Sequence, residues 1–261
     1  MRTDAVPLEE SRLTGAGGIP EMPHLHERHR AFRAVFENRQ HQRILDVAAG
    51  MGYVANRIHS GYPSGKMFCN DISPTCLKNL HAAGIPTVSY NLDGDPPTFP
   101  FADASFDAVV SLATIEHIIQ VDNFVREICR ILTPGGYLYL SAPNYASLLY
   151  LREVVLSGRT FHDPMQPDTR YEFYAHVRYF TYRTMLEYVS TFGLRPDTVY
   201  LPLPQESTTY RRMYAAHKTR ALGFRYLMKF FYTLSPRWAS EPILCFRKDG
   251  ENHRPLRKVL L

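Results

Sequence analysis

The sequence predicts an α/β protein with a doubly wound, mostly parallel sheet of seven strands and a helical cap. Three observations favour this fold. Short apolar runs alternate with helical patterns through residues 43–142. A turn of small residues, AAGMG at 48–52, joins the first apolar run to the first helical pattern. Polar residues recur where each run ends, and in such sheets ligands bind beyond the carboxyl ends of the strands.

Composition places the chain among ordinary globular proteins. Its 261 residues are 45% hydrophobic and 21% charged, enough to bury a sizeable core. No apolar run approaches the roughly 20 residues of a membrane span, and the N-terminal sequence MRTDAVPLEE has no signal-peptide core. The cysteines Cys69, Cys76, Cys129 and Cys245 are scattered, which indicates reduced thiols and a cytoplasmic protein. The net charge of +5 suits solubility or an anionic partner.

The N-terminal part predicts an arm followed by one helix. Residues 1–22 contain several Gly and Pro and predict a loop. The spacing of apolar residues predicts a helix over His24–Asn38. Histidines stand at positions 24, 26 and 29 of this segment, but no Cys or acid completes a ligand set at a suitable spacing. We therefore expect no metal site here.

The chain is organised around Arg43–Ile58, which predicts a buried strand, a tight turn and the start of a helix. Gly50 and Gly52 allow positive φ angles and a close approach of a ligand to the backbone. The N–H groups of the first helical turn then face that ligand. The same glycines fit the loose G-x-G-x-x-[GA] dinucleotide pattern, with Asp71 as the ribose-binding acid. A nicotinamide-dependent oxidoreductase is therefore an alternative hypothesis.

The remaining strands and helices follow in alternation. Asp71 ends the second strand, Ser73 can cap the next helix, and Asp122 can cap the helix after the fourth strand. Thr181 can cap a later helix that Gly193 ends. The further expected strands are 66–70, 87–92, 108–111, 137–142, 194–201 and 242–247, the last of them antiparallel.

Two stretches resemble the small-molecule branch of class I S-adenosylmethionine-dependent methyltransferases. These are Asp46-x-Ala48-x-Gly50-x-Gly52, where Ala48 replaces a customary glycine, and FPFADASFDAVVSLATIEHI at residues 99–118. The resemblance covers about 30–145. It implies a Rossmann-like methyltransferase fold in a single domain over 1–261. Residues 1–40 would be an arm and helix, 41–144 the cofactor-binding core, and 145–240 the acceptor-site cap with insertions around the last strands.

The resemblance also implies how S-adenosylmethionine binds. Asp46, Ala48, Gly50 and Gly52 would form the cofactor-binding motif. Asp71 would accept both ribose hydroxyls, and Ile72 would pack on the adenine. Asn91 or Asp93 would accept the adenine amino hydrogen, a choice that the sequence leaves open. The further implied contacts are the Leu92 amide, Ser111 beneath the methionine, and Arg30 near its carboxylate, although a solvated role for Arg30 is equally open.

Histidines are the candidate catalytic residues, because a neutral hydroxyl acceptor must lose a proton and imidazole suits that task near neutral pH. His117 and His176 are the first candidates, with His162 and Tyr174 behind them. An acceptor that is already anionic would need no base, and each side chain could instead have a structural role.

The segment Ser207–Ser240 contains seven Arg or Lys residues and no acid, interleaved with aromatic residues. Such a helix is a lid on its own domain or lies weakly on a membrane surface, and we favour the lid. No recognition motif accompanies the charge, so we expect no nucleic-acid partner.

The sequence therefore predicts a methyltransferase that acts on a small molecule, at a hydroxyl or acidic oxygen. A sugar, a polyketide, a phenol or a lipid-linked glycan would each fit as acceptor. A cofactor-binding partner subunit without activity is the alternative from another class. The oligomeric state is not indicated.

Overall fold

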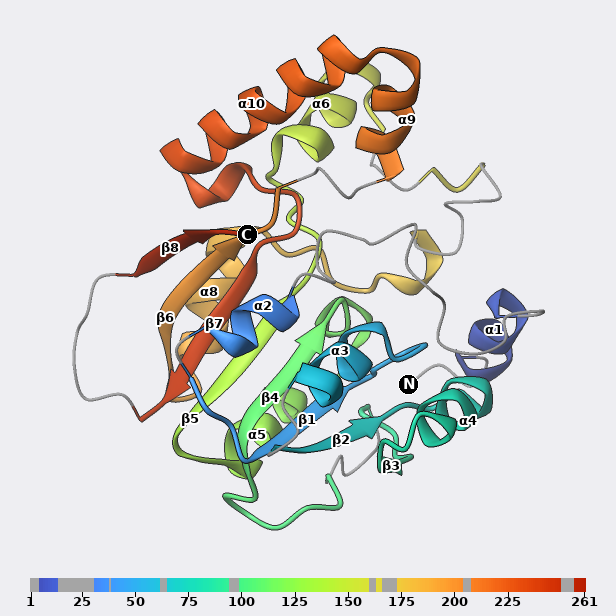
Figure 1. Ribbon diagram of the computed structural model, residues 1–261, viewed down its shortest axis with the longest axis vertical. Coiled ribbons are helices and arrows are strands. Elements are labelled where there is room, and N and C mark those ends of the chain that lie inside the picture. Colours follow the sequence, from blue (N-terminus) through green and yellow to red (C-terminus); the bar gives the residue numbers. More distant parts are fainter. Residues whose placement is uncertain are drawn as a thin grey trace.

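A twisted eight-stranded sheet forms the centre of the molecule (Figure 1). The computed structural model describes residues 5–13, 31–37, 39–61, 65–93, 99–159, 163–165, 173–203, 208–249 and 256–261. The strands are β1 Arg43–Val47, β2 Lys66–Asn70, β3 Thr87–Val88, β4 Phe106–Leu112, β5 Leu132–Ser141, β6 Leu194–Leu201, β7 Ile243–Lys248 and β8 Arg257–Leu260. They lie in the order β3-β2-β1-β4-β5-β7-β6-β8.

The pairing confirms a mostly parallel, doubly wound sheet. Strands β3, β2, β1, β4 and β5 pair in parallel, whereas β7 is antiparallel to both β5 and β6. The expected antiparallel strand at 242–247 is therefore confirmed as β7. This order places the switch point of the sheet between β1 and β4, where the chain crosses from one half of the sheet to the other.

Two expectations about strands were wrong. The sheet has eight strands rather than seven, because β8 pairs in parallel with the outer edge of β6. Its sequence RKVL is too short and too charged to signal a strand, and β6 supplies the hydrogen bonds that define it. The third strand is also shorter than 87–92. The Asn70 amide donates to the carbonyls of Val88 and Tyr90, each at 3.2 Å, in place of further ladder bonds.

Helices cover both faces of the sheet. They are α1 Ala5–Arg12, α2 Ala31–Phe36, α3 Tyr53–Gly61, α4 Pro74–Ala82, α5 Val121–Ile131, α6 Leu148–Ser157, α8 Tyr182–Ser190, α9 Thr208–Ala216 and α10 Lys218–Leu234, with short 3₁₀ turns η2 Ile115–His117 and η4 Pro236–Trp238. Successive strand residues point to opposite faces. Ile44 packs in one apolar core with α2 and α3, and Leu45 packs in another with α5 and α8.

The helix caps follow the sequence with one exception. Ser73 accepts the Cys76 N–H at the start of α4, and Thr181 forms a capping box with Thr184 at the start of α8. Asp122 does not cap α5, which was wrong. It lies within the first turn and accepts the Tyr188 hydroxyl. The backbone N–H groups of Ile119 and Gln120, just before α5, donate instead to Asp93.

The N-terminal part also differs from expectation. Residues 5–12 form helix α1 rather than a loop. Glu10 of α1 accepts hydrogen bonds from the hydroxyls of Ser73 and Thr75, and these contacts, distant in sequence, hold α1 against the start of α4. Of the helix expected at 24–38, α2 is the described part, and positions 24–30 lie outside the described residues.

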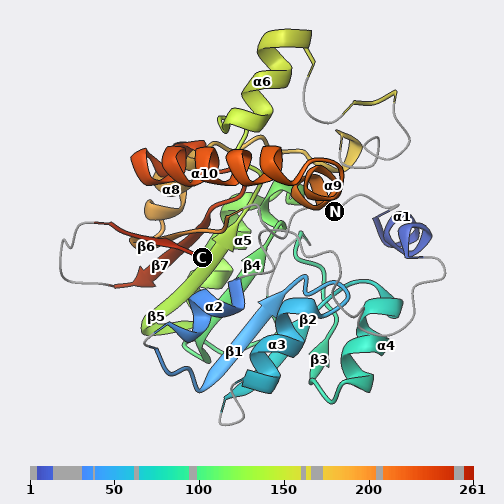
Figure 2. The ribbon, with the colours of Figure 1, turned by 45° about the horizontal axis from the view of Figure 1, so that its top comes forward.

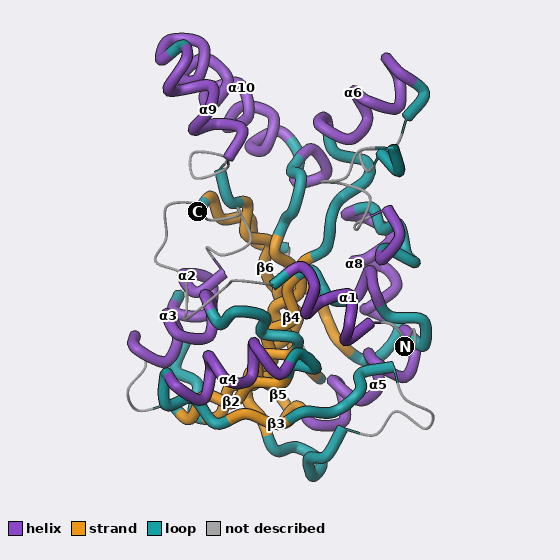
Figure 3. Tube along the Cα trace, turned by 90° about the vertical axis from the view of Figure 1, so that its right-hand side faces the viewer, coloured by secondary structure: helices purple, strands orange, loops and turns teal. Residues whose placement is uncertain are grey.

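Helices α6, α9 and α10 stand together at one end of the molecule, beyond the carboxyl ends of β1 and β4 (Figures 1 and 2). Figure 3 shows α6 and the α9–α10 pair projecting from the body on either side. Asn144, just after β5, joins this end to the core. Its amide donates to the carbonyls of Arg237 and Ala239 at 2.8 and 2.7 Å, and its oxygen accepts the Tyr182 N–H. In the described part of the chain, no helix is both long and apolar enough to cross a bilayer.

Candidate functional site

The register of the sheet brings the predicted site residues to one edge. At the carboxyl end of β1, Val47 pairs with Asn70 of β2 and with Ser111 of β4. Asp46, the 48–52 turn and Asp71 therefore surround one point beside the switch point of the sheet. This juxtaposition was predicted from the strand ends, and the pairing confirms it.

The 48–52 turn has the backbone shape that ligand approach requires. Ala48, Gly50 and Gly52 all have positive φ angles, of 56°, 56° and 83°. A Cβ atom built on Gly50 would meet nothing within 4 Å, so open space faces this backbone. Ala48 adopts the left-handed conformation although it is not glycine, at a cost of roughly 1 kcal/mol. The turn thus fits a bound small molecule lying directly over Gly50.

Asp71 links the turn to the second strand. Its carboxylate accepts the Gly50 N–H at 2.7 Å and the Ser73 N–H at 2.9 Å. Burial raises its pKa, and these N–H donors offset part of that rise. Each carboxylate oxygen keeps a second lone pair, so ribose hydroxyls can still donate to it. Ile72 beside it is half-buried.

We expect Asp71→Ala to weaken S-adenosylmethionine binding by roughly 1.5–3 kcal/mol for each charged hydrogen bond lost. Calorimetric titration measures this change. The matched control is Asp107→Ala, because Asp107 also accepts two backbone N–H groups, from Gln42 and Arg43, but at the opposite edge of the sheet. If a folded Asp71→Ala protein binds S-adenosylmethionine with wild-type affinity, Asp71 is not part of the cofactor site.

Asp46 is a buried acid at the end of β1. Burial, and then the charge of Asp71, raise its pKa to about 8. A positively charged ligand nearby would reverse this trend, because an opposite charge favours the ionised carboxylate. S-adenosylmethionine carries a sulfonium and an ammonium group, so Asp46 suits that ligand electrostatically.

The raised pKa of Asp46 predicts a stability that depends on pH. An unfolded Asp loses its proton near pH 4, whereas the folded Asp46 keeps its proton until about pH 8. The unfolded state therefore binds fewer protons over this window, and stability falls as pH rises through it. We expect the free energy of unfolding to drop by about 2 kcal/mol or more between about pH 5 and about pH 8. Asp46→Asn should flatten that slope in urea unfolding, and an unchanged slope would contradict the buried-acid assignment.

The other predicted cofactor residues differ in their hydrogen bonds and burial. The Ser111 hydroxyl is buried and has no hydrogen-bond partner among the described residues, as an atom reserved for a ligand would. Asp93 accepts the N–H groups of Ile119 and Gln120, and Asn91 accepts the Asp93 N–H. Leu92 is buried in the core. Arg30 lies outside the described residues.

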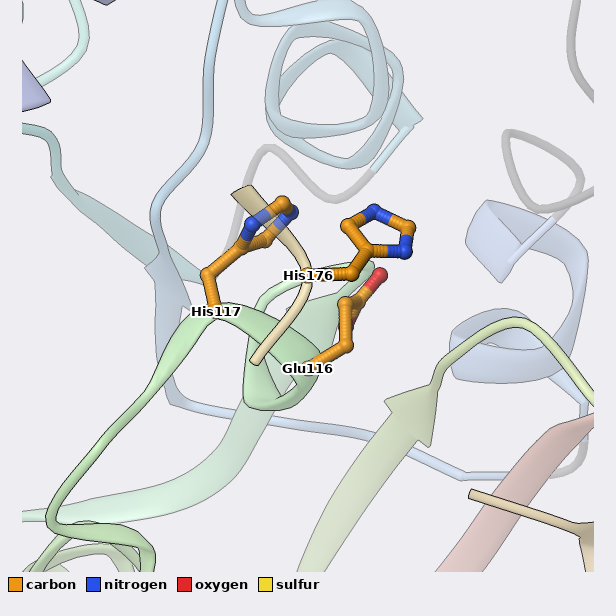
Figure 4. Close-up of side chains that lie close together, drawn as sticks. All are labelled: Glu116, His117 and His176. Carbon is orange, nitrogen blue, oxygen red and sulfur yellow. The ribbon is translucent and has the colours of Figure 1, made fainter. Parts of the chain in front are cut away.

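The two candidate bases lie side by side beyond β4. The rings of His117 and His176 meet edge to face, with centroids 4.7 Å apart. Possible ligand atoms of Glu116, His117 and His176 lie within 4.8 Å of one another (Figure 4). The Glu116 carbonyl accepts the N–H groups of Val177 and Arg178, so the chain around 176 is pinned to the η2 turn.

Hydrogen bonds set the protonation of the His117 ring. Its Nδ1 lies 3.1 Å from the Ala175 carbonyl oxygen, which can only accept. In the neutral ring Nδ1 therefore carries the proton, and Nε2 carries the lone pair. His176 Nδ1 lies 2.8 Å from the Tyr145 hydroxyl, an arrangement that either tautomer satisfies. His117 is thus prepared to accept a proton or to bind a cation through Nε2.

Sequence reasoning missed three contributors. Tyr145 and Glu10 were not singled out as candidates, and Glu116 appeared only within the motif at residues 99–118. No local pattern could have found the Tyr145–His176 contact, which joins residues 31 positions apart. His162, the third histidine candidate, lies outside the described residues, and Tyr174 is exposed.

A separate hollow of about 370 Å³ lies at the opposite edge of the sheet. Its lining includes Arg39, His41 and Asp107, at the amino-terminal ends of β1 and β4. Ligands of doubly wound sheets bind at the other edge. We therefore assign this hollow no part in the candidate site.

Comparisons with known proteins agree with this geometry. Residues 45–140 match the family model described as a methyltransferase domain. A malonyl-[acyl-carrier protein] O-methyltransferase of Methylococcus capsulatus is 31% identical over 112 residues, which are 42% of this chain and 40% of that protein. The mitochondrial arginine hydroxylase NDUFAF5 of Rattus norvegicus is 34% identical over 92 residues, which are 35% of this chain and 26% of that protein.

A solved structure shows the same fold over most of the chain. The S-adenosylmethionine-dependent methyltransferase of Mesorhizobium loti superposes with a TM-score of 0.55 at 17% identity, covering 85% of this chain and 98% of that chain. The chain spans no more than 40% of the length of the two curated relatives. Residues 45–140 thus match a methyltransferase domain, and the chain shares the fold of that S-adenosylmethionine-dependent methyltransferase.

Proposed function

We propose that this protein transfers a methyl group from S-adenosylmethionine to an oxygen atom of a small molecule, with His117 as the general base. The observation that carries the proposal is the His117 ring. Its Nδ1–H donates to the Ala175 carbonyl, so in the neutral ring the lone pair is on Nε2, just beyond β4. The end of that strand also holds the buried Ser111 hydroxyl of the cofactor site.

This chain's own residues would hold the cofactor at the carboxyl edge. The open face of Gly50 admits the ligand, Asp71 accepts the ribose hydroxyls, and Asp46 balances positive charge. When bound, S-adenosylmethionine supplies a methyl group on a sulfonium, a leaving group that needs no further activation. The protein's main tasks are then alignment of the acceptor and exclusion of water.

His117 would remove the proton that blocks attack by a neutral hydroxyl. The hydroxyl oxygen would take the methyl group as the methyl–sulfur bond breaks and its electron pair stays on sulfur, and the hydroxyl proton would pass to Nε2 of His117. His176, edge-on to His117 and hydrogen-bonded to Tyr145, would hold the His117 ring in place. The acid–base step requires a nearly neutral imidazole, which histidine provides close to neutral pH.

The acceptor classes we propose are a sugar, a polyketide, a phenol or a lipid-linked glycan. The name of the Methylococcus relative describes an O-methyltransferase, which supports oxygen as the acceptor atom. The name of the hydroxylase relative shows that similarity over this region also occurs in a protein named for another reaction. The four cysteines are free thiols, which supports the cytoplasm as the site of action.

The test is release of S-adenosylhomocysteine from S-adenosylmethionine in the presence of each acceptor class. We expect release that depends on one acceptor and on His117. Cofactor binding without release for any hydroxyl, phenol or carboxylic acid would favour the alternative, a cofactor-binding partner subunit.

A divalent cation is the second candidate role for the same cluster. The observation that favours it is the grouping of Glu116, His117 and His176 within 4.8 Å. Both histidines use Nδ1 in a hydrogen bond, as metal-binding histidines commonly do. Titration with Co²⁺ separates the two roles, because visible absorption bands that vanish in His117→Ala would indicate a metal site. The general-base proposal predicts no such bands and full activity in EDTA.

A further inference from the structure

Helix α10 has two apolar faces, and only one of them is buried. Met228 and Tyr232 belong to the main apolar core with 5% and 1% of their surface exposed, and Ala221 is fully buried. Four large apolar residues of the same helix remain in solvent: Tyr226, Leu227, Phe230 and Leu234 are 70%, 50%, 57% and 58% exposed. The helix therefore does pack on its own domain, as a lid would, and still presents an uncovered apolar stripe.

The uncovered stripe lies opposite the buried face. At about 100° per residue, the buried residues lie within about 40° of Met228 around the helix axis. The four exposed apolar residues lie about 160–260° from Met228, so they point away from the protein. An ordinary lid helix would show polar residues there.

Cations border this stripe on both sides. Lys218, Arg225 and Lys229 lie about 60–100° from Met228, and Arg220 lies about 280° from it. All four are exposed, and the described residues provide no acidic ion-pair partner for them. The segment 207–240 contains seven Arg or Lys residues and no acid. Its surface thus complements a negatively charged partner.

A second apolar element stands at the same end of the molecule. Helix α6 has no buried residue, and its Val154, Val155 and Leu156 are 48%, 77% and 77% exposed. Figure 3 shows α6 and the α9–α10 pair projecting from this end. In the described residues no helix is suited to cross a bilayer. The pattern is that of helices that lie in a membrane interface.

We propose that this end of the molecule, formed by α6, α9 and α10, docks on the surface of an anionic lipid bilayer. The stripe of α10 inserts among the acyl chains near the headgroups, and the flanking cations contact lipid phosphates. Charge complementarity favours lipid over a second copy of this chain, because two copies would bring cationic surfaces together.

Docking would place the candidate site next to the bilayer. Helices α6, α9 and α10 lie beyond the carboxyl ends of β1 and β4, where Gly50, Ser111 and His117 are found (Figure 1). A lipid or lipid-linked acceptor could then reach the site without leaving the membrane. This consequence for the acceptor rests on the proposed function, whereas the docking itself does not.

Vesicle flotation tests the docking in the absence of cofactor and acceptor. We expect the full-length protein to float with vesicles of equimolar phosphatidylcholine and phosphatidylglycerol. Binding should be at least about tenfold weaker to vesicles of phosphatidylcholine alone, and should also fall in high salt. Leu227→Ser combined with Phe230→Ser should reduce binding at least tenfold and leave the melting temperature unchanged, because neither side chain is buried.

A charge-matched pair of variants provides the control. Arg225→Glu with Lys229→Glu should abolish flotation, whereas Lys66→Glu with Lys78→Glu should retain most of it. The two double variants change the net charge equally, and Lys66 and Lys78 are exposed on β2 and α4, away from the cap. No flotation of the wild type with the anionic vesicles would overturn the proposal. So would dimers in solution that Leu227→Ser with Phe230→Ser dissociates, since the occupant would then be a second copy.

Because flotation requires neither binding of S-adenosylmethionine nor turnover, its result is independent of the proposed enzymatic function. If the protein floats but transfers no methyl group, the docking proposal is supported and the proposed reaction is contradicted. A protein that is active but does not float would do the reverse.

Discussion

Gly50→Val is expected to abolish S-adenosylmethionine binding, with a loss of at least about a hundredfold in affinity, roughly 2.7 kcal/mol. Gly50 has a φ of 56°, and a side chain built on it would enter open space rather than contact protein. We infer that this space belongs to the ligand, so a valine side chain would occupy it. The positive φ adds strain for a β-branched residue, which should also lower the melting temperature.

Gly84→Val separates the two effects. Gly84 has a φ of 75°, and a Cβ there would likewise meet nothing within 4 Å. It lies between α4 and β3, at the edge of the sheet opposite the candidate site. We expect similar destabilisation in both variants but normal cofactor affinity in Gly84→Val. If Gly50→Val binds S-adenosylmethionine normally, the pocket lies elsewhere.

Replacing His117 with alanine or asparagine should lower turnover roughly 10²–10⁴-fold, the usual contribution of a positioned base. Asparagine can keep the hydrogen bond to the Ala175 carbonyl but cannot take up a proton. Cofactor affinity should remain nearly intact, because the ring lies beyond β4 rather than in the 48–52 turn. Single-turnover methyl transfer over a pH series measures the change, and the rising limb of the wild-type profile should disappear.

The controls for this prediction use other histidines. His41→Asn changes a buried histidine that contacts the Tyr139 hydroxyl at the opposite edge of the sheet, and its activity should persist. His176→Ala should reduce turnover less than His117→Ala, because His176 acts through the ring it touches. The reverse ranking would make His176 the base. Wild-type rates in both variants would favour an acceptor that is already anionic.

Local signals predicted which residues meet at the carboxyl edge of the sheet. Asp46, Gly50 and Gly52 lie in one strand–turn–helix unit, and Asp71 follows the next strand. Parallel pairing then brings these positions together without further information. The caps at Ser73 and Thr181 were predictable for the same reason, since each bond spans three residues.

Features made by contacts distant in sequence were not predictable. Strand β8 exists because β6 offers it an edge, and α1 is held by Glu10 contacts with residues 63 and 65 positions away. The meeting of His117 with His176 depends on the bonds from Val177 and Arg178 to the Glu116 carbonyl. The sequence predicted an adenine contact for Asp93 but not that its carboxylate accepts the backbone N–H groups of Ile119 and Gln120, just before α5.

The most direct test of the central claim is calorimetric titration of the wild-type protein with S-adenosylmethionine and, separately, with reduced nicotinamide adenine dinucleotide. The methyltransferase-domain match over residues 45–140 and the geometry around Gly50, Asp46 and Asp71 predict saturable binding of S-adenosylmethionine and no binding of the dinucleotide. Saturable binding of the dinucleotide, with no heat from S-adenosylmethionine, would contradict the account.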